Sequence, residues 1–315
     1  MAGNGPKTLE VAPMDAALGA EVRGVDLSAP LSDGTVAEIA RAWADHLVLL
    51  FRGQKLSDDD ILNFSNHFGG QQAAGIRQRY LNAGYKPGDH QLQKDARINY
   101  VSNLDKDGKP ALVNSGIGSL EIRWHTDNSY TEVPPNGTLL WAEKIPDDNS
   151  GQTMFCNQYL AYDELPDDLK AAIDGKHQMH DSTRNTANRL APNATMPTSW
   201  KDIEGPVHPM VRIHPETGRK ALYLGRRWSH PSTYIVEMPT DAGEALMDRL
   251  WAHATQEKYV WTHSWRPGDM LMWDNRCVMH RRTAINPTQP RVMHRTLIKG
   301  DPVISAWAED DAAAQ

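Results

Sequence analysis

A histidine and an aspartate two residues apart, His125 and Asp127, form the stretch of this chain best suited to metal chemistry. The surrounding sequence, residues 123–130, predicts a β-strand, in which residues i and i+2 point to one face with Cα atoms roughly 6.6 Å apart. An imidazole and a carboxylate at that spacing can bind one ion, and a third ligand from elsewhere would complete a two-histidine, one-carboxylate triad with open coordination positions. The spacing alone is weak evidence, because 13 histidines and 40 acidic residues supply about two such triplets by chance.

A second triplet of this kind runs from His214 to Glu216. Pro215 fixes its backbone φ angle and Gly218 permits a chain reversal, so the sequence predicts a hairpin between strands at 210–214 and 220–224. The turn residues therefore explain the second triplet without a metal. His125 and Asp127 have no such turn residues, and on spacing alone both metal binding and chance stay open.

Two arginines near the C-terminus, Arg291 and Arg295, fall on one face of a strand predicted at 291–299. A guanidinium group on an inner face is unfavourable unless it meets an anion, whereas on an outer face it is simply solvated. The opposite face is only half apolar, so the periodicity favours neither alternative. On an inner face, each arginine would suit bidentate recognition of a carboxylate or sulfonate.

Short strands dominate the rest of the chain, and a few helices accompany them. Helices are predicted at 33–46, 58–68, 159–174 with a break at Pro166, and from residue 240 onward; further strands are predicted at 9–13, 20–25, 46–51, 97–102, 137–144, 153–157, 259–265 and 269–273. This pattern predicts a mainly β fold with packed helices, a sandwich or barrel. The length of 315 residues suits one domain or two, and the family resemblance described below implies a single domain over residues 1–315. Residues 69–121 and 176–207 are predicted to be long loops, which in compact domains are usually functional.

The bulk composition excludes several classes of partner. A net charge of −7 over 315 residues gives no electrostatic footprint for nucleic acid or an anionic membrane. No apolar run approaches the roughly 18 residues of a membrane span, and no secretory signal is visible. The two cysteines, Cys156 and Cys277, form no disulfide framework, so we expect a reduced, cytoplasmic protein in which both are small core residues.

Taken together, the motifs resemble the taurine dioxygenase / 2,4-dichlorophenoxyacetate dioxygenase family, whose members are Fe(II)- and 2-oxoglutarate-dependent oxygenases. The resemblance runs through nearly the whole chain, and the segments that carry it are 48–53, 125–127, 151–153, 208–212, 214–219, 273–280 and 291–295. It implies a double-stranded β-helix (jelly-roll) core and the cofactors Fe(II), 2-oxoglutarate and O₂. It also implies a small anionic organic substrate, such as a sulfonate or an aryloxyalkanoate, and a homo-oligomer.

Carried over position by position, the resemblance assigns His125, Asp127 and His280 as the iron ligands. Arg291 and Thr153 would bind the distal carboxylate of 2-oxoglutarate, and Arg295 would anchor the acidic group of the substrate. Asn128, Tyr130 and Trp228 are candidate substrate contacts.

Two segments depart from the family pattern, 69–121 and 225–231. In the second, Arg227 and Trp228 would either enter a pocket as a cation and an aromatic wall or lie on the surface.

Two alternative functions remain. One is a metal-bearing barrel that binds an organic acid without turnover. The other is an oxygenase that acts on a macromolecule, although the acidic net charge argues against a nucleic acid.

Overall fold

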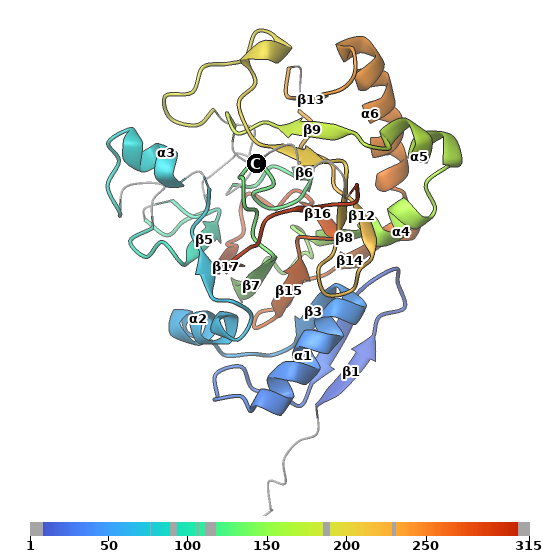
Figure 1. Cartoon of the computed structure of the whole chain (residues 1–315). Helices are drawn as coiled ribbons and strands as arrows, with labels where there is room; N and C mark the ends of the chain where they lie inside the picture. The colour runs from blue at the N-terminus through green and yellow to red at the C-terminus, as the bar shows by residue number, and fades with distance from the viewer. Residues whose placement is uncertain are drawn as a thin grey trace, which may run out of the picture.

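The computed structural model describes residues 9–75, 77–88, 93–105, 107–110, 118–184, 190–228 and 231–307. Two sheets dominate this part of the chain (Figure 1). The large sheet has the order β1 (Glu10–Pro13), β2 (Ala20–Arg23), β3 (Val48–Phe51), β15 (Met270–Asp274), β7 (Gly137–Lys144), β17 (Val292–Ile298) and β4 (Gln71–Gln72), with β5 (Asn99–Ser102) also paired to β17. The smaller sheet has the order β14 (Val260–His263), β8 (Thr153–Asn157), β16 (Val278–Arg282) and β6 (Ile122–His125).

Two three-stranded sheets and several helices complete the described fold. The sheets are β10 (Val207–Pro209), β9 (His177–His180) and β13 (Thr233–Ile235), and β12 (Lys220–Leu222), β11 (Val211–Ile213) and β18 (Ile304–Ser305). The helices are α1 (Asp33–His46), α2 (Asp58–Asn66), α3 (Arg77–Asn82), α4 (Gln158–Asp163), α5 (Asp167–Ile173) and α6 (Thr240–Ala254), with 3₁₀ turns at Trp200–Asp202 and Glu257–Tyr259. None of the helices in the described ranges is long and apolar enough to cross a membrane.

The alternation of side chains along the strands divides the protein into layers. On β15, Met270 and Met272 face a cluster with α1 and α2, whereas Leu271 and Trp273 face a cluster between the two main sheets. On β16, Met279 packs toward α5 and α6, whereas Val278 joins the cluster between the sheets. In Figure 1, α1 and α2 accordingly lie at one end of the view and α6 at the other. Because Val278 points between the sheets, the other even-numbered residues of β16, including His280, point the same way.

Local sequence signals explain most element boundaries. Ser32 caps α1 by accepting a hydrogen bond from the backbone NH of Thr35, and Ser57 with Asp60 forms a capping box at the start of α2. Strands β7 and β8 have the predicted bounds, Pro166 separates α4 from α5, and β11 pairs with β12 around the predicted hairpin tip. The prediction of a mainly β fold with packed helices is confirmed.

Two sequence predictions differ from the structure. The strand predicted over 123–130 ends at His125, and Asn128 lies in the left-handed region with φ 48°. Asp127 therefore lies in a loop just beyond β6, since the tight turn that follows is incompatible with an extended strand. The two predicted long loops are not all loop: 69–121 contains β4 and α3 besides the expected β5, and 176–207 contains β9 and the 3₁₀ turn at Trp200–Asp202.

Candidate functional site: a buried His–Asp–His cluster

The end of β6 and the middle of β16 bring His125, Asp127 and His280 together. Strands β6 and β16 are neighbours, with His280 paired to His125. Nε2 of His125 lies 3.7 Å from Oδ1 of Asp127, and Nε2 of His280 lies 3.9 Å from Oδ2 of the same carboxylate. All three side chains are buried, and their ligand atoms lie within 4.8 Å of one another.

Hydrogen bonds and burial prepare these groups to bind a metal. Nδ1 of His125 lies 2.8 Å from the backbone carbonyl of Arg123, so it carries the proton and Nε2 keeps a free lone pair. Burial, and next the neighbouring His125, lower the pKa of His280 to about 3, so its ring is neutral at pH 7. Burial alone would raise the pKa of Asp127, but Arg295, His280 and His125 together outweigh it, and the pKa lies well below its ordinary value.

The donor set fits a divalent transition metal. Two neutral imidazoles and one carboxylate are the ligands of the facial triad, in which two ligands bonded at about 2.1 Å and about 90° apart lie about 3.0 Å from each other. The separations of 3.7 and 3.9 Å from Asp127 are somewhat wider, so small side-chain rotations would bring the three groups onto one ion. The Nδ1 of His280 is buried and has no partner in the described chain, whereas Nε2 is the ring nitrogen that faces Asp127. A bound ion would take the lone pair of Nε2.

A buried arginine without an acidic partner in the described ranges precedes β17, the strand that carries Arg295. Arg291 is 2% exposed and precedes β17, and in the described ranges no carboxylate pairs with it. Its backbone is fixed by Asn103, whose Oδ1 accepts a 2.8 Å hydrogen bond from the Arg291 NH. Burial, and after it the charge of Arg282, lower the pKa of Arg291 well below its ordinary value. An uncompensated buried guanidinium indicates a site for an anion.

Thr153 is the first residue of β8, the strand that pairs with β16. Its hydroxyl oxygen accepts a 2.9 Å hydrogen bond from Nε1 of Trp265, so the hydroxyl proton is available to a further acceptor. Gly151, two residues earlier, packs against Arg291: a Cβ at this position would lie 3.2 Å from Nε of the arginine.

Arg295 points toward the His–Asp–His cluster, as expected if its face of the strand is turned inward. Its Nη1 lies 3.4 Å from Oδ1 of Asp127, and its side chain is 24% exposed. The solvated-face alternative is therefore wrong for Arg295, and it is also wrong for the buried Arg291.

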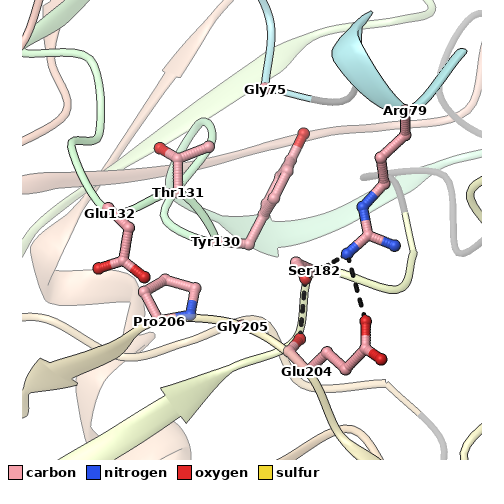
Figure 2. A pocket seen from close by; sticks show the side chains of 9 residues that line it. All are labelled: Gly75, Arg79, Tyr130, Thr131, Glu132, Ser182, Glu204, Gly205 and Pro206. Carbon is pink, nitrogen blue, oxygen red and sulfur yellow. Dashed lines mark hydrogen bonds and ion pairs between the residues drawn. The ribbon is translucent and has the colours of Figure 1, made fainter. Parts of the chain in front are cut away.

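The loop after Asp127 leads into a cavity of about 460 Å³. The buried Tyr130 forms part of its wall (Figure 2). Its hydroxyl donates a 2.8 Å hydrogen bond to Oδ1 of Asn128. Two other segments contribute: Arg79 of α3 reaches down to Ser182 and Glu204. The lining residues are Gly75, Arg79, Tyr130, Thr131, Glu132, Ser182, Glu204, Gly205 and Pro206.

Sequence reasoning singled out Arg227 and Trp228, but the residue that reaches this region is Arg226. Its guanidinium lies 4.1 Å from the ring centroid of Tyr130, and it donates to the carbonyl oxygens of Asp181 and Arg184. Arg227 instead pairs with two acids of α6, and Trp228 contacts Arg123 of β6. No local signal separates the adjacent arginines, since only the packing of 225–228 against 181–184 decides which one turns inward.

The second triplet, from His214 to Glu216, has a structural role, as its turn residues predicted. Nε2 of His214 faces Oδ2 of Asp274 at 3.0 Å, and its Nδ1 accepts hydrogen bonds from the backbone NH groups of Glu216 and Thr217. Arg276 pairs with Asp274 and with Glu216. His214, Asp274 and Cys277 do cluster, but both imidazole nitrogens and the carboxylate are already engaged, so this group is not a metal site.

Comparisons with known proteins agree with the geometry. The model of the taurine catabolism dioxygenase TauD, TfdA family matches residues 10–297. This chain belongs to that family. It is 32% identical over 305 residues to the alpha-ketoglutarate-dependent 2,4-dichlorophenoxyacetate dioxygenase of Cupriavidus pinatubonensis, covering 93% of this chain and 98% of the relative.

Two further family relatives cover nearly the whole chain. The (S)-phenoxypropionate/alpha-ketoglutarate-dioxygenase of Sphingobium herbicidovorans is 32% identical over 93% of this chain and 96% of the relative. The crystal structure of AAD-2 in complex with Mn(II) and N-oxalylglycine matches with a TM-score of 0.75 at 29% identity, over 95% of this chain and 99% of that one. The family resemblance inferred from the sequence is confirmed, and with it the reaction class: the chain is a 2-oxoglutarate-dependent dioxygenase rather than a barrel that binds an acid without turnover.

Proposed function

We propose that this chain uses Fe(II), 2-oxoglutarate and O₂ to hydroxylate a small organic acid. The observation that carries the proposal is a buried His–Asp–His cluster with Arg295 beside it, while Arg291, just before the same strand, is buried without an acidic partner among the described residues. Bound iron with 2-oxoglutarate supplies the oxidising chemistry: the 2-oxo acid loses CO₂ and becomes succinate, and the substrate gains one oxygen atom from O₂.

His125, Asp127 and His280 would hold the iron and leave three positions open. Arg291 and Thr153 would bind the distal carboxylate of 2-oxoglutarate, because Arg291 is buried without an acid and the Thr153 hydroxyl has a proton to donate. These residues orient the co-substrate and exclude water from it.

Arg295 would anchor the anionic group of the substrate. It is the partly exposed arginine beside Asp127, so it offers a positive charge to an anion next to the metal ligands. Asn128, Tyr130 and Trp228 are the proposed further contacts, and the position of Tyr130 in the cavity wall supports its inclusion. The substrate class is a sulfonate, an aryloxyalkanoate or a similar carboxylate. Where the hydroxylated carbon bears oxygen, nitrogen or sulfonate, the product would collapse to a carbonyl and release that group.

The proposal extends to the architecture. The two main sheets would form a double-stranded β-helix within a single domain over residues 1–315, with the long segments 69–121 and 176–207 covering the site. In support, Arg79 and Ser182 come from those two segments, and both line the cavity beside Tyr130. We further propose a cytoplasmic homo-oligomer, whose size a sedimentation measurement on the purified protein would establish.

Spectroscopy and turnover test the assignment together. Anaerobic addition of Fe(II) and 2-oxoglutarate should produce the visible charge-transfer band of a chelated 2-oxo acid, and a panel of sulfonates, alkyl sulfates and aryloxy acids should then elicit succinate release. His125→Ala and Asp127→Ala should lose the band and the release, whereas His67→Ala, an exposed residue after α2, should keep both. Undiminished succinate release in either site variant would refute the triad. Failure of every small acid in the panel would favour a macromolecular substrate.

A further inference from the structure

Arg282, like Arg291, is a buried arginine, and no function has been assigned to it above. It is 5% exposed at the end of β16, two residues beyond His280, and in the described part of the chain no carboxylate pairs with it. A buried charge without a counter-charge is strongly unfavourable, and two such charges near one another repel as well. Such an arrangement indicates a missing anion.

Strand register places Arg282 on the inner face. Residues 280 and 282 of β16 share one face, the face that Val278 buries between the two main sheets. In the antiparallel pair with β8, Arg282 lies directly opposite Thr153, as His280 lies opposite Phe155. The rings of Phe155 and His280 are stacked with centroids 6.2 Å apart, which confirms that these cross-strand pairs point the same way.

Arg291 reaches the same corner from the other sheet. The pairing of the two strands continues past Thr153, since the NH of Gly151 donates to the carbonyl oxygen of Ala284 at 2.9 Å. Gly151 in turn is the residue against which the Arg291 side chain packs. Burial and then the charge of Arg282 lower the pKa of Arg291, so the two guanidinium groups are electrostatic neighbours.

We propose that Arg282 is a second cation for the distal carboxylate of 2-oxoglutarate, beside Arg291 and Thr153. This inference rests on the proposed function. The Nη atoms of Arg282 donate to the carbonyl oxygens of Gly118 and Leu120, which leaves its positive charge and its unpartnered, buried Nε for the anion. The same two bonds hold the segment that leads into β6 and its ligand His125. The carboxylate thus neutralises a pair of arginines, one from each main sheet region, and Arg282 also fixes the chain that approaches the metal.

Two 2-oxo acids separate this role from a purely structural one. 2-Oxoglutarate carries the distal carboxylate, whereas 2-oxovalerate has the same carbon chain ending in a methyl group. Their affinities for the Fe(II)-loaded protein are measured by anaerobic calorimetry, and the ratio of the two dissociation constants reports the distal-carboxylate site alone. A change in the metal region or the fold would alter both affinities together.

We expect Arg282→Gln to weaken 2-oxoglutarate binding roughly 10- to 100-fold and to change 2-oxovalerate binding little. Arg282→Lys keeps the charge and should retain more of the preference for 2-oxoglutarate. The matched control is Arg281→Gln on the outer face of the same strand, where the guanidinium lies 5.5 Å from the Trp124 ring; it removes a charge without changing the interior and should leave the ratio unchanged.

The outcomes are distinct. An unchanged ratio in Arg282→Gln, or an equal loss for both acids, would overturn the proposal and leave Arg282 as a clamp of the 118–120 segment. Identical ratios in Arg282→Lys and Arg282→Gln would also overturn it, even if both variants are less stable. Failure of the wild-type protein to bind either 2-oxo acid would instead refute the proposed function itself.

Discussion

The hydroxyl of Thr138 donates a 2.9 Å hydrogen bond to Oδ2 of Asp127 and so ties β7 of the large sheet to the loop after β6 of the small sheet. Thr138 is itself held by Nδ2 of Asn275 at 3.0 Å, and Oδ1 of Asn275 accepts from Nε1 of Trp273 at 3.0 Å. This buried chain of hydrogen bonds orients the carboxylate, which lies outside any strand and has no backbone pairing of its own to position it.

Substitution of Thr138 tests whether these hydrogen bonds orient Asp127. Thr138→Val removes the donor to Asp127 while conserving shape, and we expect metal affinity to fall roughly 10- to 100-fold. Calorimetric titration with Mn(II) measures the affinity without turnover. Thr138→Ser, which retains the hydroxyl, is the control and should bind nearly as tightly as wild type. Equal affinities in all three proteins would show that Asp127 is oriented by other contacts.

Gly151→Ala should damage the co-substrate site. The added Cβ would lie 2.9 Å from Cγ1 of Ile285 and 3.2 Å from Nε of Arg291, so the arginine must shift. We expect KM for 2-oxoglutarate to rise about tenfold. The backbone cost at φ +74°, about 1 kcal/mol, is controlled by Gly218→Ala, which has φ +70° and nothing within 4 Å of its Cβ. If Gly218→Ala raises KM equally, the effect is not local.

Substitution of Arg295 should separate substrate from co-substrate binding. Arg295→Gln removes the partly exposed cation beside Asp127 but leaves Arg291 in place. We expect KM for the acidic substrate to rise by about 100-fold and the dissociation constant for 2-oxoglutarate to change little, since a charge-assisted bidentate contact is lost. Steady-state kinetics on the best substrate of the panel, together with calorimetry, give both values. A loss confined to 2-oxoglutarate would reverse the roles of the two arginines.

The adjacent arginines of the 225–228 segment should behave oppositely. Arg226→Met leaves the Tyr130 wall without its stacked cation and removes the hydrogen bonds to the carbonyl oxygens of Asp181 and Arg184, so it should cost about 3 kcal/mol of stability and raise substrate KM. Arg227→Met loses only the pairs with Glu244 and Asp248 near the surface and should cost less than about 1 kcal/mol. Urea denaturation and substrate kinetics of the two variants decide this, and the reverse order would contradict the placement of Arg226.

Buried histidines should make stability depend on pH. Burial lowers the pKa of His208 from 6.5 to about 4, and its Nε2 remains hydrogen-bonded to the carbonyl oxygen of Thr131. Between about pH 6.5 and about pH 4, the imidazole is protonated in the unfolded chain but neutral in the folded chain. The free energy of unfolding therefore falls as the pH decreases from about 6.5 to about 4, by up to about 1.4 kcal/mol per pH unit for this residue.

His208→Gln should remove that contribution and make the slope between pH 6 and pH 5 shallower by about that amount. Urea denaturation of the metal-free protein at several pH values measures the slope. His67→Gln, at an exposed position, serves as the control and should leave the slope as in wild type. An identical slope in His208→Gln would mean that this imidazole is protonated in the folded protein.

Local signals were sufficient for much of the fold. The capped starts of α1 and α2, the bounds of β7 and β8 and the hairpin of β11 and β12 follow from residues that are neighbours in sequence. Pro215 and Gly218 likewise identify the triplet from His214 to Glu216 as part of a turn. The triad residues were also recognisable, because their types and spacing form a motif.

Other features depend on which strands lie side by side. Asp127 lies beyond its strand and is oriented by Thr138 and Arg295, which are 11 and 168 residues away in the sequence. Arg282 faces inward because β16 pairs with β8 in one register, and a shift of one residue would have exposed Arg281 to the interior instead.

The sequence by itself therefore determined the residue types of the candidate ligands, and its resemblance to a known family determined the expected reaction class. Only the tertiary structure decided which arginines are buried without an acid and which hydrogen bonds orient the metal carboxylate. Those properties arise from the register and layering of strands distant in sequence, and no local pattern encodes them.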